Sequence, residues 1–297
     1  MSMRISENSM VQDFLKNLEA ARQRWFGWSQ QVSTGKKLQK PSDNPSDSAR
    51  LIRLRDEFSR TNQYLRNVSR AQTKLATASS ALNTLRNLTI SVSEKAIFAL
   101  TDTTSQDSRD AIALELRGLL QNVEQVAATS VDGQYIFSGT QIDQPPVTVV
   151  DGNYVYQGDS QSPTIEITQG ESINVAVPGS EVFSDPSADL LNTLQQLIDQ
   201  LEAGDLAGAQ ASVGGIQEAG KVIDAARFKI STGINQADNA DLRLNAQLLD
   251  LTSEVSSLED ADMAEAISRM TQAETALSAS LGAGAQMRQG SLFDYLG

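Results

Sequence analysis

Few residues of this chain have side chains suited to chemistry, and they do not form a catalytic set. The chain has 297 residues and contains no Cys and no His. This excludes a thiol nucleophile, a disulfide, a zinc site with the usual ligands and a Ser/His/Asp relay. The carboxylates Asp43, Asp47, Asp260 and Asp262 lie where turns and helix starts are expected. We therefore interpret them as capping residues rather than metal ligands.

Two short glycine-containing patterns also have simpler explanations. The segment Gly35-Lys36-Lys37 lacks the upstream glycine and the following Ser/Thr of a phosphate-binding loop. Asp151-Gly152-Asn153 resembles part of a calcium loop, but the other ligand positions are missing and a hairpin turn is the better interpretation. We predict no cofactor, no metal ion and no enzymatic activity. An enzyme that uses only carboxylates of the central segment is the remaining catalytic alternative.

Charge is distributed unevenly along the chain. Residues 1–100 contain 16 basic and 8 acidic residues, whereas the remainder contains 8 basic and 29 acidic residues. The basic part leaves a nucleic-acid-binding coiled coil as an alternative, which predicts steeply salt-dependent binding. However, basic residues such as Arg53 and Arg60 are interleaved with apolar helix positions. We therefore interpret them as a solvated or subunit-facing surface and expect no nucleic-acid partner.

Neither a membrane span nor a cleavable signal is expected from the sequence. The chain has no run of 18 consecutive apolar residues, so we predict no membrane insertion. The first residues are polar and lack the apolar region of a secretory signal. Export, if it occurs, would use another route.

Helical periodicity predicts a first helix that ends before Gly35. Apolar residues from Met10 to Val32 recur at steps of three and four, and this stripe includes Phe14, Leu18, Trp25 and Trp28. We interpret the two tryptophans as packing residues rather than a ligand platform. Turn formers follow, and Asn44 with Pro45 predicts the start of a second helix. The residues assigned to this turn are Pro41, Asp43, Asn44 and Pro45.

The second helix carries a heptad seam and should extend to about Phe98. From Leu51 to Leu82, the residues of this seam are spaced alternately three and four positions apart, without interruption. Three of the ten positions are polar, namely Thr61, Gln72 and Ser79, which favours a bundle of several helices over a two-stranded zipper.

The character of the chain changes between residues 132 and 186. This segment holds five of the seven prolines and alternating runs such as Val147 to Val150, which predict short strands. Helical spacing then returns and continues to the C-terminal region, where Asp262 is expected to cap a last helix. The apolar stripe of that helix includes Ile267, Met270, Leu277 and Leu281.

These patterns predict a mainly α fold with a small β insertion. We expect an elongated, rod-like helical bundle in which the N- and C-terminal helices pack together, with an outer β domain. The expected domains are a terminal coiled coil (1–40 and 259–297), a long-helix bundle (41–131 and 187–258) and the β domain (132–186). Because two lone helices bury little apolar surface, the terminal domain should be disordered in the monomer and ordered in an assembly.

Several motifs together resemble the flagellin family of bacterial axial proteins. They are MRIS at 3–6, QQVSTGKKL at 30–38, PSDNPSDSA at 41–49, GQYIFSG at 133–139 and LEDADMAEAISRM at 258–270. Within the family, the chain is most similar to members that join hook to filament. Flagellins typically have a turn containing lysine and alanine where this chain has Pro41 to Pro45.

The resemblance implies a structural subunit of the bacterial flagellum, exported through the flagellar type III secretion channel and assembled outside the cell. The implied partners are the first hook-associated protein, flagellin, copies of the same chain in a ring, and an export chaperone at the C-terminal helix. It implies that the terminal stripes, among them Phe14, Trp25 and Leu277, form the assembly interface. The alternative within the family is a flagellin filament subunit of the same fold.

Overall fold

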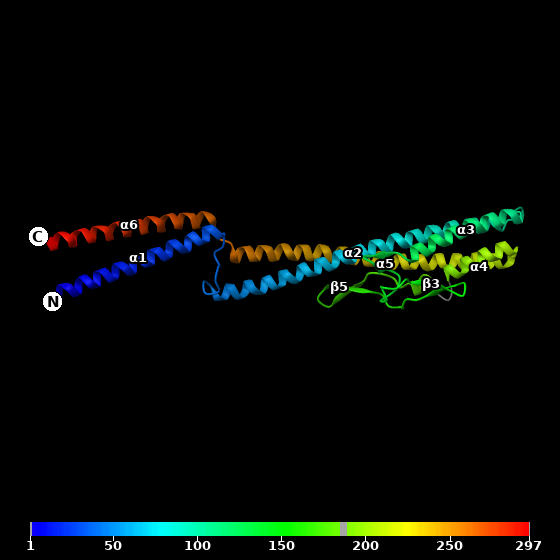
Figure 1. Cartoon of the computed structure of the whole chain (residues 1–297), viewed down its shortest axis with the longest axis horizontal. Coiled ribbons are helices and arrows are strands. Elements are labelled where there is room, and N and C mark those ends of the chain that lie inside the picture. Colours follow the sequence, from blue (N-terminus) through cyan, green and yellow to red (C-terminus); the bar gives the residue numbers. More distant parts are fainter. Residues whose placement is uncertain (1, 185–188, 297) are drawn as a thin grey trace. The chain divides into compact units, whose positions relative to one another are not determined.

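The computed structural model describes the backbone of residues 2–184 and 189–296, and the side chains of residues 11–184 and 189–286. The described elements are dominated by helices, with short antiparallel strand pairs between α3 and α4 (Figure 1). This confirms the predicted fold class, a mainly α chain with a small β insertion. The predicted domain boundary at residue 186 lies outside the described residues.

The described part of the chain forms six α-helices, and the end of the first and the starts of the second and the last follow the predicted signals. The helices are α1 (Ser2–Thr34), α2 (Pro45–Ala99), α3 (Gln106–Ala127), α4 (Leu190–Ala203), α5 (Leu206–Glu259) and α6 (Met263–Leu296). Helix α1 ends before Gly35, whose φ of 69° is the left-handed conformation common after a helix. Asn44 caps α2 by accepting a hydrogen bond from the amide of Asp47, and Asp262 caps α6 by accepting one from the amide of Glu265.

Among the described residues, the strands form three separate two-stranded antiparallel sheets. The pairs are β1 (Ser130–Val131) with β2 (Gln134–Tyr135), β3 (Val147–Val150) with β4 (Asn153–Tyr156), and β5 (Thr164–Thr168) with β6 (Glu171–Asn174). Asp151 and Gly152 connect β3 to β4 with φ angles of 51° and 82°. Two consecutive positive φ angles are typical of a tight hairpin turn, so the hairpin interpretation of this segment is confirmed.

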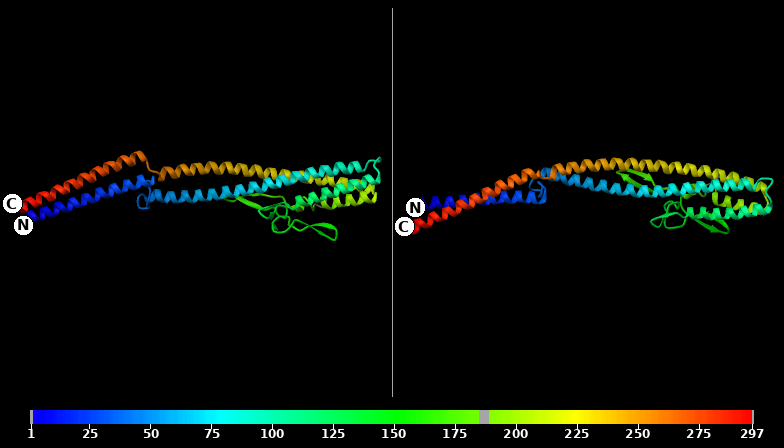
Figure 2. Two further views of the ribbon diagram at one scale, coloured as in Figure 1. Left: turned by 45° about the horizontal axis from the view of Figure 1, so that its top comes forward. Right: turned by 90° about the horizontal axis from the view of Figure 1, so that it is seen from above.

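Chain contacts divide the molecule into two compact units. One unit contains Met1–Ser59 and Leu248–Gly297, and the other contains Arg60–Gln247. In the first unit, α1 and α6 run side by side in opposite directions (Figures 1 and 2). In the second unit, α2 and α5 are antiparallel neighbours, α3 packs on α4, and the strand pairs belong to the same unit.

The core of the second unit is built mainly from Leu, Ile, Val and Ala, as the low aromatic content predicts. Its largest fully buried side chains include Leu75, Leu82, Leu85, Leu116, Leu194 and Ile198. Phe137 and Phe183 add an edge-to-face ring contact with centroids 5.3 Å apart beneath the strand segment. Most of the predicted α2 seam is buried or half-buried, but Phe58 remains 37% exposed.

Candidate assembly interface

The apolar stripes of α1 and α6 meet along the helix pair of the first unit. Ala21 and Ala266 are 5% and 1% exposed, so small residues mark the places of closest contact. Six of the eight residues predicted for the assembly interface are half-buried in this unit: Phe14, Leu18, Trp25, Trp28, Met270 and Leu277. A two-helix contact therefore covers part of each of these side chains and leaves the rest accessible.

The other two predicted interface residues are more exposed. Ile267 is 47% exposed and Leu281 is 55% exposed. Their positions on α6 fit the predicted stripe, but a single partner helix is too narrow to cover the whole stripe. Because each side chain is already about half covered, burying the rest of it in an assembly would contribute roughly 1 kcal/mol, about half of what full burial gives.

Three exposed apolar residues of α1 were missed by the sequence reasoning. Val11, Leu15 and Phe26 are 51%, 55% and 61% exposed. The signal was available, because each of them directly follows a stripe residue (Met10, Phe14 and Trp25). Doubled apolar positions of this kind widen the apolar face beyond what one neighbouring helix needs.

Gly284 on α6 leaves room for the ring of Phe14 on α1. A Cβ atom at this position would lie 2.5 Å from Cζ of Phe14. Any larger residue at position 284 must displace the Phe14 ring. In contrast, a Cβ atom at Gly282, on the same helix, would meet nothing within 4 Å.

The predicted turn residues connect α1 to α2 through a hydrogen-bonded loop. One carboxylate oxygen of Asp43 accepts hydrogen bonds from the amides of Gln39 (3.1 Å) and Lys40 (2.9 Å). These bonds hold the pKa of Asp43 below its usual value. Pro45 is the first residue of α2, where a missing N–H costs no helical hydrogen bond. The turn therefore combines capping with rigid backbone, as its composition indicates.

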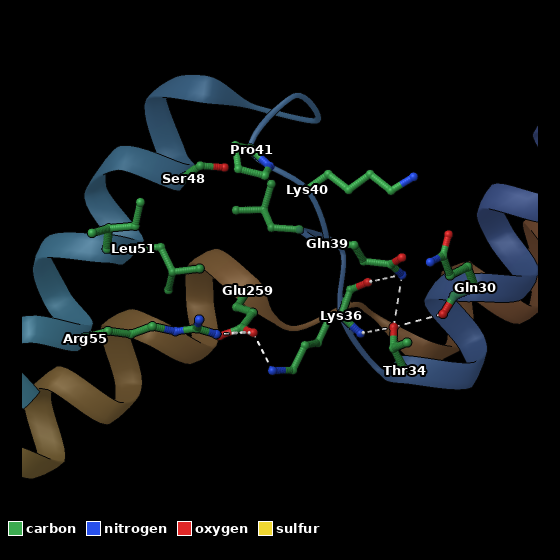
Figure 3. A pocket seen from close by; sticks show the side chains of 12 residues that line it. Gln30, Thr34, Lys36, Gln39, Lys40, Pro41, Ser48, Leu51, Arg55 and Glu259 are labelled. Carbon is green, nitrogen blue, oxygen red and sulfur yellow. Dashed lines mark hydrogen bonds and ion pairs between the residues drawn. The ribbon is translucent and has the colours of Figure 1, made fainter. Parts of the chain in front are cut away.

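Glu259, the last residue of α5, links the loop between α1 and α2 to the loop between α5 and α6. Its side chain is 6% exposed and lies 2.5 Å from Nζ of Lys36 and 2.6 Å from a guanidinium nitrogen of Arg55 (Figure 3). Its carbonyl oxygen accepts from the amide of Lys37, and the amide of Ala261 donates to the carbonyl of Gly35. Burial alone would raise the pKa of Glu259, but Lys36 and Arg55 outweigh it and hold the pKa below its usual value.

An open groove of about 440 Å³ lies beside this ion cluster. Leu38, Pro41, Leu51 and Ile52 contribute apolar surface to it, and Lys36, Arg55 and Glu259 are among its polar lining residues (Figure 3). Lys36 and Arg55 are already paired with Glu259. The groove is thus a feature of the connection between helices.

Metal and membrane chemistry find no support in the described residues. Among them, no group of three or more His, Cys, Asp or Glu side chains is placed to hold a metal ion. No helix in the described part of the chain is long and apolar enough to cross a membrane.

The chain belongs to the bacterial flagellin family. The family model of the flagellin N-terminal helical region matches residues 5–142, and that of the C-terminal helical region matches residues 213–296. The resemblance drawn from the sequence motifs is therefore confirmed.

The similar curated proteins include flagellar hook-associated protein 3 of Escherichia coli, 25% identical over 98% of this chain and 99% of that protein. Flagellar hook-associated protein 3 of Salmonella typhimurium is 24% identical over 91% of this chain and 86% of its own length. Flagellin B of Helicobacter pylori is 28% identical, but over only 37% of this chain and 22% of its own length.

Solved structures share the fold. The flagellar junction protein of Legionella pneumophila has a TM-score of 0.60 at 16% identity, over 71% of this chain and all of that one. A flagellar hook-associated protein of Vibrio parahaemolyticus has a TM-score of 0.69 at 21% identity, over 73% of this chain and all of that one.

Proposed function

We propose that this chain is a structural, non-catalytic subunit of the bacterial flagellum that joins the hook to the filament. In this role copies of the chain form a ring, with the first hook-associated protein on one side and flagellin on the other. The observation that carries the proposal is the uncovered apolar surface of the α1–α6 pair, where Leu281 and Phe26 are 55% and 61% exposed. Such a surface has a purpose only where neighbouring subunits cover it.

The mechanism is folding coupled to polymerisation. The terminal domain (1–40 and 259–297) is disordered in the free monomer and becomes ordered when its stripes are buried against neighbours. Ordering these residues costs conformational entropy, which burial in the assembly offsets. The half-buried state of Phe14 and Trp25 in the helix pair supports this mechanism, because one pair alone leaves the burial incomplete.

The same apolar surface needs to be covered by another protein before assembly. The chain is exported through the flagellar type III channel to the outside of the cell, and an export chaperone holds the C-terminal helix until then. Exposed Ile267 and Leu281 give such a chaperone an apolar contact on α6. Binding there would also prevent the two stripes of the chain from pairing prematurely.

The alternative within the family is a filament subunit. The correspondence with hook-associated protein 3 extends along nearly the whole of both chains, whereas the correspondence with flagellin B is confined to 112 residues. A filament subunit would be expected to share its length and organisation with a flagellin. This difference in coverage favours the junction.

Immunogold electron microscopy of intact flagella tests the location. We expect an antibody against this chain to label a single narrow band where the curved hook meets the filament. Labelling along the whole filament would instead support the flagellin alternative. Absence of label from flagella whose filaments bind a flagellin antibody normally would contradict both readings.

A further inference from the structure

Two separate stretches of chain connect the terminal helices to the long helices, and these two connections are bonded to each other. Residues 35–44 connect α1 to α2, and residues 260–262 connect α5 to α6, all within the first unit. Between the two connections, Lys36 and Asp260 form an antiparallel β-bridge. Its two backbone hydrogen bonds, each 2.8 Å long, run from the amide of Lys37 to the carbonyl of Glu259 and from the amide of Ala261 to the carbonyl of Gly35. We call the contacts between residues 35–37 and residues 259–261 the linker latch.

Side chains reinforce the linker latch. The ammonium of Lys37 donates to the carbonyl oxygen of Ser257 at 2.6 Å. This carbonyl is one of the last of α5, which have no partner inside the helix. The carboxylate of Glu259 lies 2.5 Å from Nζ of Lys36 and 2.6 Å from a guanidinium nitrogen of Arg55 on α2 (Figure 3). The latch therefore joins the connection after α1 both to the end of α5 and to α2.

The linker latch removes freedom that the connections would otherwise have. An unbonded linker can rotate about two backbone dihedral angles per residue, and the connection between α1 and α2 has ten residues. The bridge fixes the first three of them to the short connection between α5 and α6. Further along, Asp43 accepts hydrogen bonds from the amides of Gln39 and Lys40. With the latch closed, neither connection can twist without the other.

We propose that the linker latch is a conformational device with an open and a closed state, and that the closed latch carries mechanical force between the terminal helices and the long helices. The inference rests on the proposed function, in which the chain joins two parts of a flagellum that drives swimming. With the latch open, a pull or a twist is transmitted only through two unpaired linkers. With the latch closed, the force is shared by two backbone hydrogen bonds and by the ion pairs of Glu259.

The closed state depends on all three members of the ion cluster. The side chain of Glu259 is 6% exposed, whereas those of Lys36 and Arg55 are 47% and 55% exposed. A carboxylate buried to this extent is costly without its cationic partners. Lys36 lies two residues after the end of α1, so it is held in place for Glu259 only where α1 is ordered. We therefore expect the latch to close as the terminal domain becomes ordered in the assembly, which is where force is applied.

Controlled shear of flagellated cells tests whether the latch carries force. In cells that express only Glu259→Gln, the side chain keeps its shape but loses both ion pairs. We expect the filaments of these cells to detach roughly fivefold faster than those of unmodified cells at the same shear, leaving bare hooks that electron microscopy can count. The matched control is Glu254→Gln, which removes an ion pair with Arg50 (3.0 Å) between the same two helices but outside the latch. Its filaments should detach at the unmodified rate.

A disulfide that keeps the latch closed provides a second test. The chain has no native Cys, so Lys36→Cys and Asp260→Cys introduce the only thiols. Opposite residues of an antiparallel pair that are flanked by its hydrogen bonds have Cα atoms about 4.5 Å apart, which suits a disulfide. Reduced filaments of this double variant should detach faster than unmodified ones, because the ion pair of Lys36 with Glu259 is lost. Oxidation should return detachment to the unmodified rate or below while swimming continues, and the single Cys variants should not respond to oxidation.

Equal detachment of Glu259→Gln and Glu254→Gln filaments would overturn the proposal, and so would oxidised double-variant filaments that detach as fast as reduced ones. Loss of swimming on oxidation would show that the latch has to open in use, which also contradicts the proposal. Variants that build no filaments at rest would assign these residues to folding rather than to force. If this chain is absent from isolated flagella of unmodified cells, the proposed function fails and the inference with it. If the chain is present and detachment is unchanged, only the inference fails.

Discussion

The ring of Phe14 on α1 packs over Gly284 on α6, at a point where a single added carbon would lie 2.5 Å from the ring. This contact links residues near the two ends of the sequence. The uncovered remainder of the same helix pair is the surface that we assign to assembly.

Replacing Gly284 with Leu should therefore weaken the helix pair. The new side chain must displace Phe14, at a cost of about 1 kcal/mol, near the lower end of overpacking effects because Phe14 is only half-buried. We expect reduced swimming in a soft-agar assay. The control Gly282→Leu has open space and should swim normally. Adding Phe14→Leu to Gly284→Leu removes the ring but keeps an apolar side chain at this interface position, so it should restore part of the motility. Failure to do so would mean that crowding against the ring is not the cause.

A charge at Leu281 should abolish assembly without unfolding the rest of the chain. Because Leu281 is 55% exposed, Leu281→Glu should change the thermal unfolding of the purified protein by less than about 0.5 kcal/mol. In an assembly the same charge would be buried without a partner, so the variant should be missing from isolated flagella. Gln272→Glu, at an exposed position about half a turn around α6 from Leu281, is the control. Loss of helical circular dichroism across the whole protein would contradict this account.

Glu259 should stabilise the first unit in a pH-dependent way. Its pKa in the folded protein lies below the ordinary value of 4.5, so its contribution is present above about pH 4.5 and is lost as the pH falls through the folded pKa. In the ordered first unit, Glu259→Gln should lower the free energy of unfolding by about 1 kcal/mol at pH 7, since both cationic partners are half-exposed. Because the terminal domain is ordered only in the assembly, the measurement is the urea-induced release of the chain from isolated flagella at pH 7 and at pH 3. The difference between the variant and the unmodified chain should shrink at pH 3.

The matched control for this ion cluster is Glu254→Gln. Glu254 pairs with Arg50 at 3.0 Å, but its side chain is 49% exposed. We expect a smaller effect than that of Glu259→Gln. Equal effects of the two variants on the free energy of unfolding would show that burial does not strengthen the ion pairs of Glu259.

Gly179 should be intolerant of a side chain. A Cβ atom there would lie 2.6 Å from the carbonyl oxygen of Phe137 and 2.6 Å from Cε2 of Tyr156, and the first of these is backbone. Gly179→Ala should lower the free energy of unfolding by about 1–3 kcal/mol, measured by thermal denaturation. Gly118→Ala, on α3 with nothing within 4 Å, should stabilise by roughly 0.5–1 kcal/mol. If Gly179→Ala left the free energy of unfolding unchanged, the strand segment would have shifted to make room for the new side chain.

Local signals predicted much of the fold. Gly35, Asn44 and Asp262 marked helix ends because their conformations and side chains act on backbone within three residues. The run from Val147 to Val150 was recognised as a strand by its composition. In each case the determining interaction is close in sequence.

The features that the sequence did not predict depend on contacts between residues that are distant in sequence. Arg55 meets Glu259 across 204 positions, and no local pattern indicates such a pairing. Periodicity likewise placed Ile267 and Leu277 on one stripe, but it could not tell which of them α1 covers. Whether a side chain of α6 is covered depends on the width of the neighbouring helix, and this is set by the tertiary structure.

The proposed junction role is tested most directly by deleting the gene and examining the cells by electron microscopy, with flagellin measured in the culture medium. We expect bare hooks and flagellin shed into the medium, because flagellin would still be exported but would have nothing on which to assemble. Re-expression of the chain should restore filaments, and re-expression of Leu281→Glu should not. Normal filaments in the deletion strain, with no flagellin released, would contradict the proposed function.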